Sequence, residues 1–154
     1  MKAPNNKRLS SEERKKMIVK SAITAFGKSN YRATRMADIA AEAGVSEAML
    51  YKHFESKKAM FLSILENVSK RTETAIEWEF GEEPDALMLL RRSRIEYYNQ
   101  IKKHPNLLKL HFQAVSEIDD EEIGGHIKKD HEVYVNDIKE LIKKGLEQGT
   151  VRKD

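Results

Sequence analysis

The feature that most constrains the fold is the scarcity of residues that interrupt helices. Only three of the 154 residues are proline and only seven are glycine. Between these breaks, apolar residues recur every three or four positions, which is the spacing of one helix face, and we find no alternating strand pattern of useful length. The sequence therefore predicts an all-α fold.

Seven helices are expected from this periodicity and from residues that can cap a first turn. Four of them follow a serine or threonine whose hydroxyl can accept from first-turn amides, namely Ser10, Thr34, Ser46 and Ser56. Pro84 opens the fifth helix, Pro105 stops it, and an acidic turn at residues 119–122 precedes the last helix. The expected helices cover about residues 10–29, 34–43, 46–54, 56–80, 84–104, 106–116 and 122–149.

Basic charge is concentrated in the first part of the chain. Residues 1–60 hold 13 lysines and arginines against 6 acidic residues, a net charge of +7, whereas residues 61–154 hold 15 against 19, a net charge of −4. Clustered basic charge favours binding to a phosphate backbone, because binding releases condensed counterions. A merely solvated basic surface would show the same clustering, so charge alone leaves both interpretations open.

The composition and spacing of reactive residues disfavour an enzyme. The chain has no cysteine, which excludes disulfides, thiolate metal sites and a cysteine nucleophile. Histidines at positions 104, 111, 126 and 131 lack the i, i+4 spacing with which two imidazoles share one ion. No nucleophile with its base, no pair of catalytic carboxylates and no phosphate-binding loop is found. We therefore expect no enzymatic activity, no metal and no cofactor.

Signals for membranes and secretion are also missing from the sequence. No apolar run approaches the ~20 residues that a membrane-spanning helix needs. The basic N-terminus has no apolar stretch behind it, unlike a secretion signal. We expect the protein to act in the cytoplasm.

The most specific segment runs from Thr34 to Phe54. Ala40, four residues before Gly44, is small enough for two short helices to approach at a wide angle, and Gly44 permits the positive φ of a tight turn between them. Residues expected to share a core with the first helix are Ile39, Ala43, Val45 and Leu50. Those expected to face outward, wholly or in part, are Glu47, Ala48, Met49, Tyr51, Lys52 and His53. A helix presented in this way can enter the major groove of DNA.

This segment and its flanks resemble the TetR family of bacterial transcriptional regulators over about residues 10–62. The residues that carry the resemblance are Thr34, Ile39-Ala40, Ala43-Gly44-Val45-Ser46, Leu50-Tyr51, His53-Phe54, Ser56-Lys57 and Met60-Phe61. Two positions depart from the family pattern. Asn30 stands where glycine is usual, and Ala37 stands where a basic residue is frequent, which would narrow or weaken base contacts near the start of the second helix.

The resemblance implies DNA contacts from the helix-turn-helix and from the start of the fourth helix. Thr34 and Tyr51 would hold phosphates or sugars, and His53 would contact the backbone. Lys57 would anchor a phosphate, because helix-terminal amides and an ammonium act together there. The alternative for Tyr51 and His53 is core packing. The expected DNA-binding residues are Thr34, Arg35, Ser46, Glu47, Ala48, Met49, Tyr51, Lys52, His53 and Lys57.

Three of these residues are expected to read sequence rather than the backbone. Met49 can contact a thymine methyl, Glu47 can accept from a cytosine amine, and Ala48 lies between them. For Arg35 and Lys52 the alternative is a solvated charge without a DNA contact.

Beyond residue 80 the resemblance concerns architecture alone and implies a domain for ligand binding and dimerisation. Arg94 lies within an apolar stripe of the fifth helix, where it can bind the acidic end of an otherwise apolar ligand. Alternatively, Arg94 pairs with a carboxylate such as Glu117 or Asp130. Trp78 suits a core position as well as a ligand platform. The expected ligand-binding residues are Trp78, Arg94, Tyr97, Tyr98, His111, Phe112, His131 and Tyr134.

The sequence thus predicts a disordered basic arm over residues 1–9, a helix-turn-helix DNA-binding domain over 10–56 and a helical regulatory domain over 57–154. Family members normally continue with two more helices, which build the dimer interface, and the regulatory domain is expected to lack them. We therefore expect exposed apolar surface on the fifth to seventh helices.

The expected function is that of a ligand-responsive repressor. It would bind a palindromic operator in double-stranded DNA as a homodimer and be released by a small, largely apolar effector. The alternative is a helical protein that binds small molecules and carries a non-functional or auxiliary DNA module. Salt-dependent binding to duplex DNA distinguishes the two.

Overall fold

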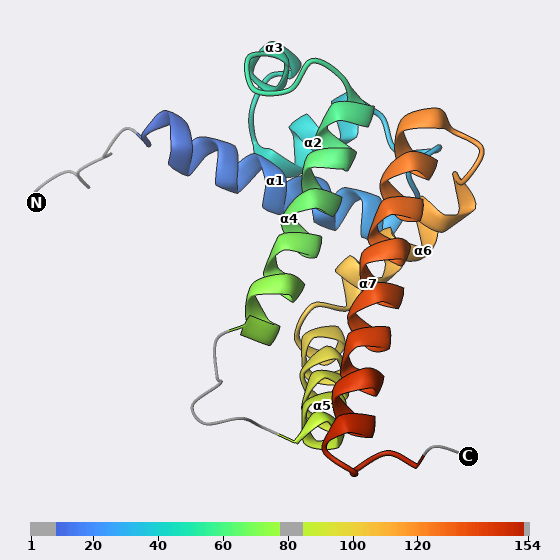
Figure 1. Ribbon diagram of the computed structural model, residues 1–154. Helices are drawn as coiled ribbons and strands as arrows, with labels where there is room; N and C mark the ends of the chain where they lie inside the picture. Colours follow the sequence, from blue (N-terminus) through green and yellow to red (C-terminus); the bar gives the residue numbers. More distant parts are fainter. Residues whose placement is uncertain (1–8, 78–84, 153–154) are drawn as a thin grey trace, which may run out of the picture. The chain divides into compact units, whose positions relative to one another are not determined.

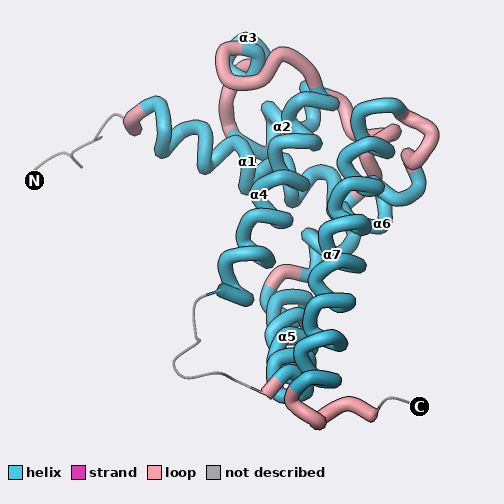
Figure 2. The backbone as a smooth tube through the Cα atoms, in the orientation of Figure 1, coloured by secondary structure: helices cyan, strands magenta, loops and turns pink. Residues whose placement is uncertain are grey.

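A computed structural model describes residues 9–77 and 85–152 of the chain, with the backbone alone described for residues 70–77. Regular structure in these ranges is entirely helical, which confirms the predicted all-α class (Figures 1 and 2). The helices are α1 (Ser11–Lys28), α2 (Met36–Ala43), α3 (Glu47–Tyr51), α4 (Lys57–Glu77), α5 (Ala86–Lys103), α6 (Pro105–Ser116) and α7 (Glu121–Glu147).

The chain forms two compact units that meet within α4. Unit 1 comprises residues 1–64 and unit 2 comprises residues 65–154. Because residues 61–64 carry no charge, unit 1 has the full net charge of +7 and unit 2 has the net charge of −4. None of the described helices is apolar over a length that would take it across a membrane.

The capping box expected at the start of α1 is confirmed. The amide of Glu13 donates to the Ser10 hydroxyl at 3.1 Å, and the amide of Ser10 donates to the Glu13 carboxylate at 2.8 Å. These bonds satisfy two amides that would otherwise have no partner in the first turn. The pKa of the Glu13 carboxyl is lowered by hydrogen bonds to Ser10, first to its backbone N–H and then to its side chain.

The expected cap of α2 is wrong by one residue. Arg35 is the N-cap, and its backbone N–H donates to the Asp38 carboxylate at 2.8 Å. Thr34 is buried, and its hydroxyl donates to the Asn30 carbonyl at 2.7 Å instead of accepting from α2. The Thr34 side chain is therefore bound within the loop between α1 and α2 rather than at the start of α2.

Several later boundaries differ from the sequence expectations. α3 ends at Tyr51 rather than near Phe54. α5 ends at Lys103, before Pro105 as expected, but Pro105 is itself the first residue of α6, a position where its missing N–H costs no hydrogen bond. The acidic turn is the start of α7, because the Asp120 carboxylate accepts from the amides of Glu122 and Ile123.

Unit 1 is built around apolar side chains from all four of its helices. The largest that are fully buried are Ile18, Phe26, Ile39, Leu50, Met60, Phe61 and Ile64. The Phe26 and Phe61 rings pack edge to face with centroids 5.2 Å apart, and Tyr31 lies 4.6 Å from Phe61. Each fully buried large side chain contributes ~1.5–3 kcal/mol relative to exposure. The four helices of unit 1 thus share one core.

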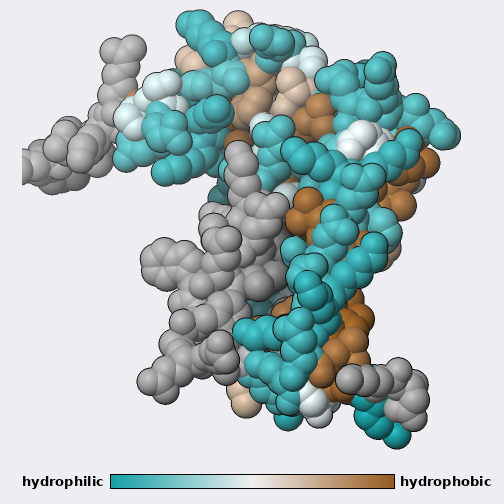
Figure 3. Space-filling view, in the orientation of Figure 1, coloured by the Kyte–Doolittle hydropathy of each residue, from teal (hydrophilic) through white to brown (hydrophobic). Residues whose placement is uncertain are grey.

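Among the side chains that the structure describes, fewer apolar ones are buried in unit 2 than in unit 1. α5, α6 and α7 pack pairwise, and the fully buried side chains among them include Ala86, Leu110, Ala114 and Ile123. Many large apolar side chains stay exposed, as the sequence predicts, and Figure 3 shows apolar surface beside the polar outer face of α7. They are Leu87, Met88, Ile95, Tyr97, Tyr98, Phe112, Val115, Ile118, Val133, Tyr134 and Ile142.

Candidate nucleic-acid interface

The turn between α2 and α3 depends on glycine. Gly44 has φ of 64° and ψ of 34°, the left-handed conformation that the sequence predicts. A Cβ at Gly44 would meet no atom within 4 Å, so the backbone conformation and not crowding calls for glycine. Val45 then donates its N–H to the Ala40 carbonyl at 3.0 Å, and the Ser46 hydroxyl accepts from the amide of Met49 at 3.3 Å. These bonds set the direction in which α3 begins.

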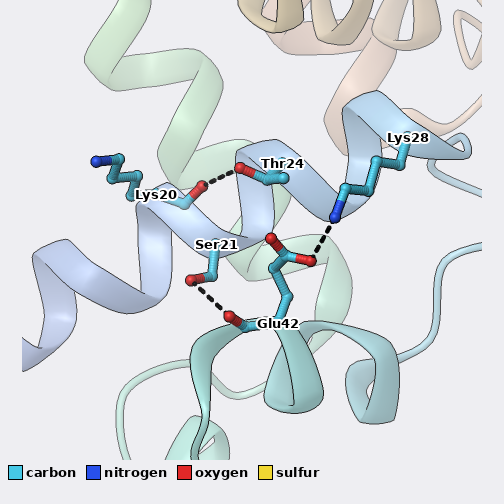
Figure 4. Close-up of polar contacts among 5 residues, drawn as sticks. All are labelled: Lys20, Ser21, Thr24, Lys28 and Glu42. Atoms are coloured by element: carbon cyan, nitrogen blue, oxygen red, sulfur yellow. Dashed lines mark hydrogen bonds and ion pairs between the residues drawn. The ribbon is translucent and has the colours of Figure 1, made fainter.

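Polar contacts between α1 and α2 orient the pair (Figure 4). The Lys28 ammonium lies 2.8 Å from the Glu42 carboxylate, and the Ser21 hydroxyl donates to the Glu42 carbonyl at 3.5 Å. The Lys28 side chain is 66% exposed, so this ion pair contributes little stability.

The start of α4 is attached to the loop between α1 and α2 through Lys57. Its ammonium donates to the carbonyls of Tyr31, Arg32 and Thr34 at 2.6, 3.2 and 2.9 Å. It also lies 4.7 Å from the centre of the Tyr31 ring. Lys57 therefore uses its three donors inside the protein, which differs from the expectation that it anchors a phosphate. We call this arrangement the carbonyl cage.

α3 and the residues next to its two ends carry most of the residues expected to contact DNA. Tyr51 is 53% exposed, so it does not pack in the core, whereas Met49 and His53 are half-buried. The other exposed members of the expected set are Arg35, Ser46, Glu47, Ala48 and Lys52. Thr34 is the exception, because it is 2% exposed and its hydroxyl donates to the Asn30 carbonyl, so this hydroxyl is not displayed on the outward surface.

Two basic residues of α1 reach the same region, and sequence reasoning missed both. The Arg14 guanidinium lies 4.0 Å from the sulfur of Met49, and the Lys15 ammonium lies 5.5 Å from the centre of the Phe54 ring. The available signal was their position one helical turn before Ile18, on the side of α1 that enters the core.

The residues expected to bind a ligand are less closely grouped. Trp78 lies outside the described residues. The other seven are all exposed, namely Arg94, Tyr97, Tyr98, His111, Phe112, His131 and Tyr134. Arg94 contacts Tyr134, donating to its hydroxyl with the guanidinium carbon 5.5 Å from the centre of its ring. A shallow, open depression on α7 is lined by His131, Glu132, Val135, Asn136 and Lys139, of which only His131 belongs to the expected set.

Asp130, one of the two carboxylates proposed as partners of Arg94, makes other contacts. Asp130 accepts from the Ser69 hydroxyl at 2.5 Å, and its carboxylate lies 3.3 Å from Nε2 of His126. Ser69 belongs to α4 and Asp130 to α7, so the contact attaches the second half of α4 to unit 2. Within the described part of the chain, no three His, Asp or Glu side chains are grouped closely enough to hold a metal ion.

Comparisons with known proteins find relatives of the helix-turn-helix segment. The sequence model for bacterial regulatory proteins of the tetR family matches residues 18–64. The uncharacterized HTH-type transcriptional regulator YerO of Bacillus subtilis is 43% identical over 54 residues, covering 35% of this chain and 19% of YerO. The HTH-type transcriptional activator FasR of Mycolicibacterium smegmatis is 25% identical over 147 residues, covering 94% of this chain and 67% of FasR. The chain spans between 19% and 40% of the lengths of the first three curated relatives that it matches.

Solved structures extend the likeness to the helices of unit 2. A transcriptional regulator of Saccharomonospora viridis in complex with choline superposes with a TM-score of 0.79 at 25% identity, covering 94% of this chain and 76% of that one. FadR of Bacillus subtilis in complex with stearoyl-CoA gives 0.67 at 18% identity, covering 90% and 74%. The second likeness concerns the fold alone. Residues 18–64 thus match the tetR family of bacterial regulatory proteins, and this segment carries the helix-turn-helix.

Proposed function

We propose that the protein is a repressor that binds a palindromic operator as a homodimer and leaves it when unit 2 binds a small, largely apolar effector. The observation that carries the proposal is the outward face of α3, set by Gly44 and Ser46, on a unit with a net charge of +7. A helix so placed can enter the major groove, and the surrounding positive charge supplies affinity for the phosphates.

Roles within the interface follow from exposure. Tyr51 and Lys52 contact the phosphate backbone beside the groove, and Glu47, Ala48 and Met49 meet base edges, because the first turn of the recognition helix points into the groove. Arg35, Ser46 and His53 flank this surface.

Lys57 and Thr34 have a different role in this proposal. The carbonyl cage engages the Lys57 ammonium, and the Thr34 carbonyl is one of its acceptors. Both residues hold the loop before α2 and so orient the helix-turn-helix, while other residues touch the DNA.

Dimerisation is supported by the exposed apolar side chains of unit 2. A palindrome is read by two recognition helices one turn of DNA apart, ~34 Å, which requires two copies of the chain. Ile95, Tyr98 and Phe112 are 52%, 64% and 64% exposed, and a second copy would remove such side chains from water.

The proposed effector is small and mostly apolar. The chain's neighbours in structure include regulators in complex with choline and with stearoyl-CoA, which supports a ligand role for the helices after α4. Arg94 and the aromatic residues expected around it provide one cation and several rings. An effector with an acidic end and an apolar body suits this chemistry.

Selection of random duplex fragments by the full chain tests the proposal. We expect enrichment of one palindromic motif at moderate salt, with affinity that falls steeply as salt rises. Retention without a motif would contradict operator recognition, and a motif without two-fold symmetry would contradict binding as a dimer. A chain that retains no duplex at low salt would instead fit the small-molecule-binding alternative.

A further inference from the structure

The contact between Arg14 and Met49 joins two segments that are 35 residues apart in the sequence. Arg14 lies in α1, four residues before the segment that matches the family model begins. Met49 lies in the first turn of α3, where its amide donates to the Ser46 hydroxyl. Lys15 makes a parallel contact with Phe54. The first turns of α1 thus lie against the helix proposed to read DNA.

The contact between Arg14 and Met49 can fix the position of the Met49 side chain. Methionine has three rotatable bonds, so the helix alone does not fix where its methyl group lies. A thioether sulfur is a weak acceptor and uses only part of the five-donor guanidinium. Arg14 is half-buried, and no carboxylate of the described residues pairs with it. Its remaining N–H groups are available to an external anion.

We propose that Arg14 is a positioning residue for base reading. Its guanidinium holds the Met49 thioether in one place and donates its remaining N–H groups to a DNA phosphate beside α3. Through Arg14, the position of the protein along the DNA phosphate backbone is thereby coupled to the position of the Met49 methyl group that contacts a base. The inference rests on the proposed function, because it assumes that α3 enters the groove.

The positioning half can be tested without DNA. In protein labelled with ¹³C in its methionine methyl groups, the six methionines give six resonances, and Met49→Leu assigns that of residue 49. We expect Arg14→Ala to move the Met49 resonance towards its random-coil position. Lys20→Ala removes one positive charge from the same helix, and the exposed Lys20 side chain points away from Glu42 in Figure 4. An Arg14→Ala resonance that coincides with that of Lys20→Ala would overturn the positioning role.

The phosphate half is tested by binding of the full chain to random duplex at several salt concentrations. We expect Arg14→Ala to reduce the slope of log Kd against log salt by about 0.9, the value for one phosphate contact, relative to Lys20→Ala. Arg14→Lys keeps the charge and should retain most of the slope. Equal slopes for Arg14→Ala and Lys20→Ala would overturn the phosphate contact.

Repeating the fragment selection with the variants links the two halves. We expect both Arg14→Ala and Arg14→Lys to relax base preference at the position next to Met49, because neither side chain offers a planar guanidinium to the sulfur. Unchanged preference would overturn the positioning role. If the unsubstituted chain shows no salt-dependent binding, the proposed function fails and the phosphate contact with it, whereas the methyl resonance still decides whether Arg14 holds Met49.

Discussion

Two polar side chains of unit 1 are turned towards the protein's own backbone. The Thr34 hydroxyl donates to the Asn30 carbonyl, and the Lys57 ammonium fills the carbonyl cage. Neither could be predicted from periodicity, because the path of the loop at residues 29–35 decides where both groups point. The outward set on α3 could be predicted, because Ser46 and Gly44 set the phase of a short helix and Leu50 marks its buried side.

At Tyr51 the structure leads to a test of a single contact. Tyr51→Ala should weaken binding to the selected operator by roughly fivefold, the equivalent of about 1 kcal/mol for one net hydrogen bond, with little change in helical content. Titration of labelled operator, together with circular dichroism, checks this. Gln100→Ala is the control, because Gln100 is also exposed but lies on α5, outside the expected DNA contacts and the proposed dimer contacts. Operator affinity in Tyr51→Ala equal to that of Gln100→Ala would contradict the contact.

Glu13 predicts a pH dependence for the start of α1. Because contacts with Ser10 lower the pKa of Glu13 in the folded state, its contribution to stability is complete above the ordinary glutamate pKa and is lost as pH falls through the lowered value. The difference in Tm between the unsubstituted chain and Glu13→Gln should therefore shrink between pH 6 and pH 3. Thermal unfolding at both pH values measures it, and a difference that grows on acidification would contradict this sign.

At the scale of elements, the helix N-caps formed by a single serine hydroxyl could be predicted. Ser10, Ser46 and Ser56 accept from first-turn amides, as their positions in the sequence predict. The Asp120 cap of α7 was not recognised, because an acidic run reads equally well as a solvated turn or as a first turn with a carboxylate cap. The contact between Arg14 and Met49 was also missed, because it requires the arrangement of α1 against α3.

Adjacent glycines near the start of α7 have opposite expected tolerances. A Cβ at the buried Gly124 would lie 2.1 Å from the carbonyl oxygen of Ile118, so Gly124→Ala must shift the backbone and should cost ~1–3 kcal/mol. A Cβ at Gly125 meets nothing within 4 Å, so Gly125→Ala should stabilise the helix by ~0.5–1 kcal/mol. Urea unfolding of both variants checks the pair. Equal shifts in the two midpoints would contradict the close approach at Gly124.

For the whole molecule, the fold class and the exposed apolar surface could be predicted from the sequence. Whether the residues expected to bind a ligand enclose a site could not. Periodicity marks one apolar face per helix and does not reveal which faces find a partner. In unit 2 the aromatic residues expected around a ligand that the structure describes are exposed, and Arg94 pairs with Tyr134 rather than with Glu117 or Asp130.

Self-association should follow from these exposed side chains. We expect concentration-dependent dimerisation in analytical ultracentrifugation, weakened about tenfold, which corresponds to ~1.4 kcal/mol, by Ile95→Lys or Phe112→Lys. Gln100→Lys places the same charge at an exposed polar position of α5 and is the control. A chain that sediments as a monomer at every concentration, or a Gln100→Lys variant as disruptive as the other two, would contradict an interface on this surface.

The division of charge between the units also has a kinetic consequence. The field of a DNA duplex attracts unit 1, with its net charge of +7, and repels unit 2, with its net charge of −4. This field favours encounters in which unit 1 approaches the duplex first, so that productive collisions are more frequent than for randomly oriented molecules. Added salt shortens the range of this field. The association rate constant for the duplex, and not only the residence time of the complex, should therefore decline as ionic strength rises.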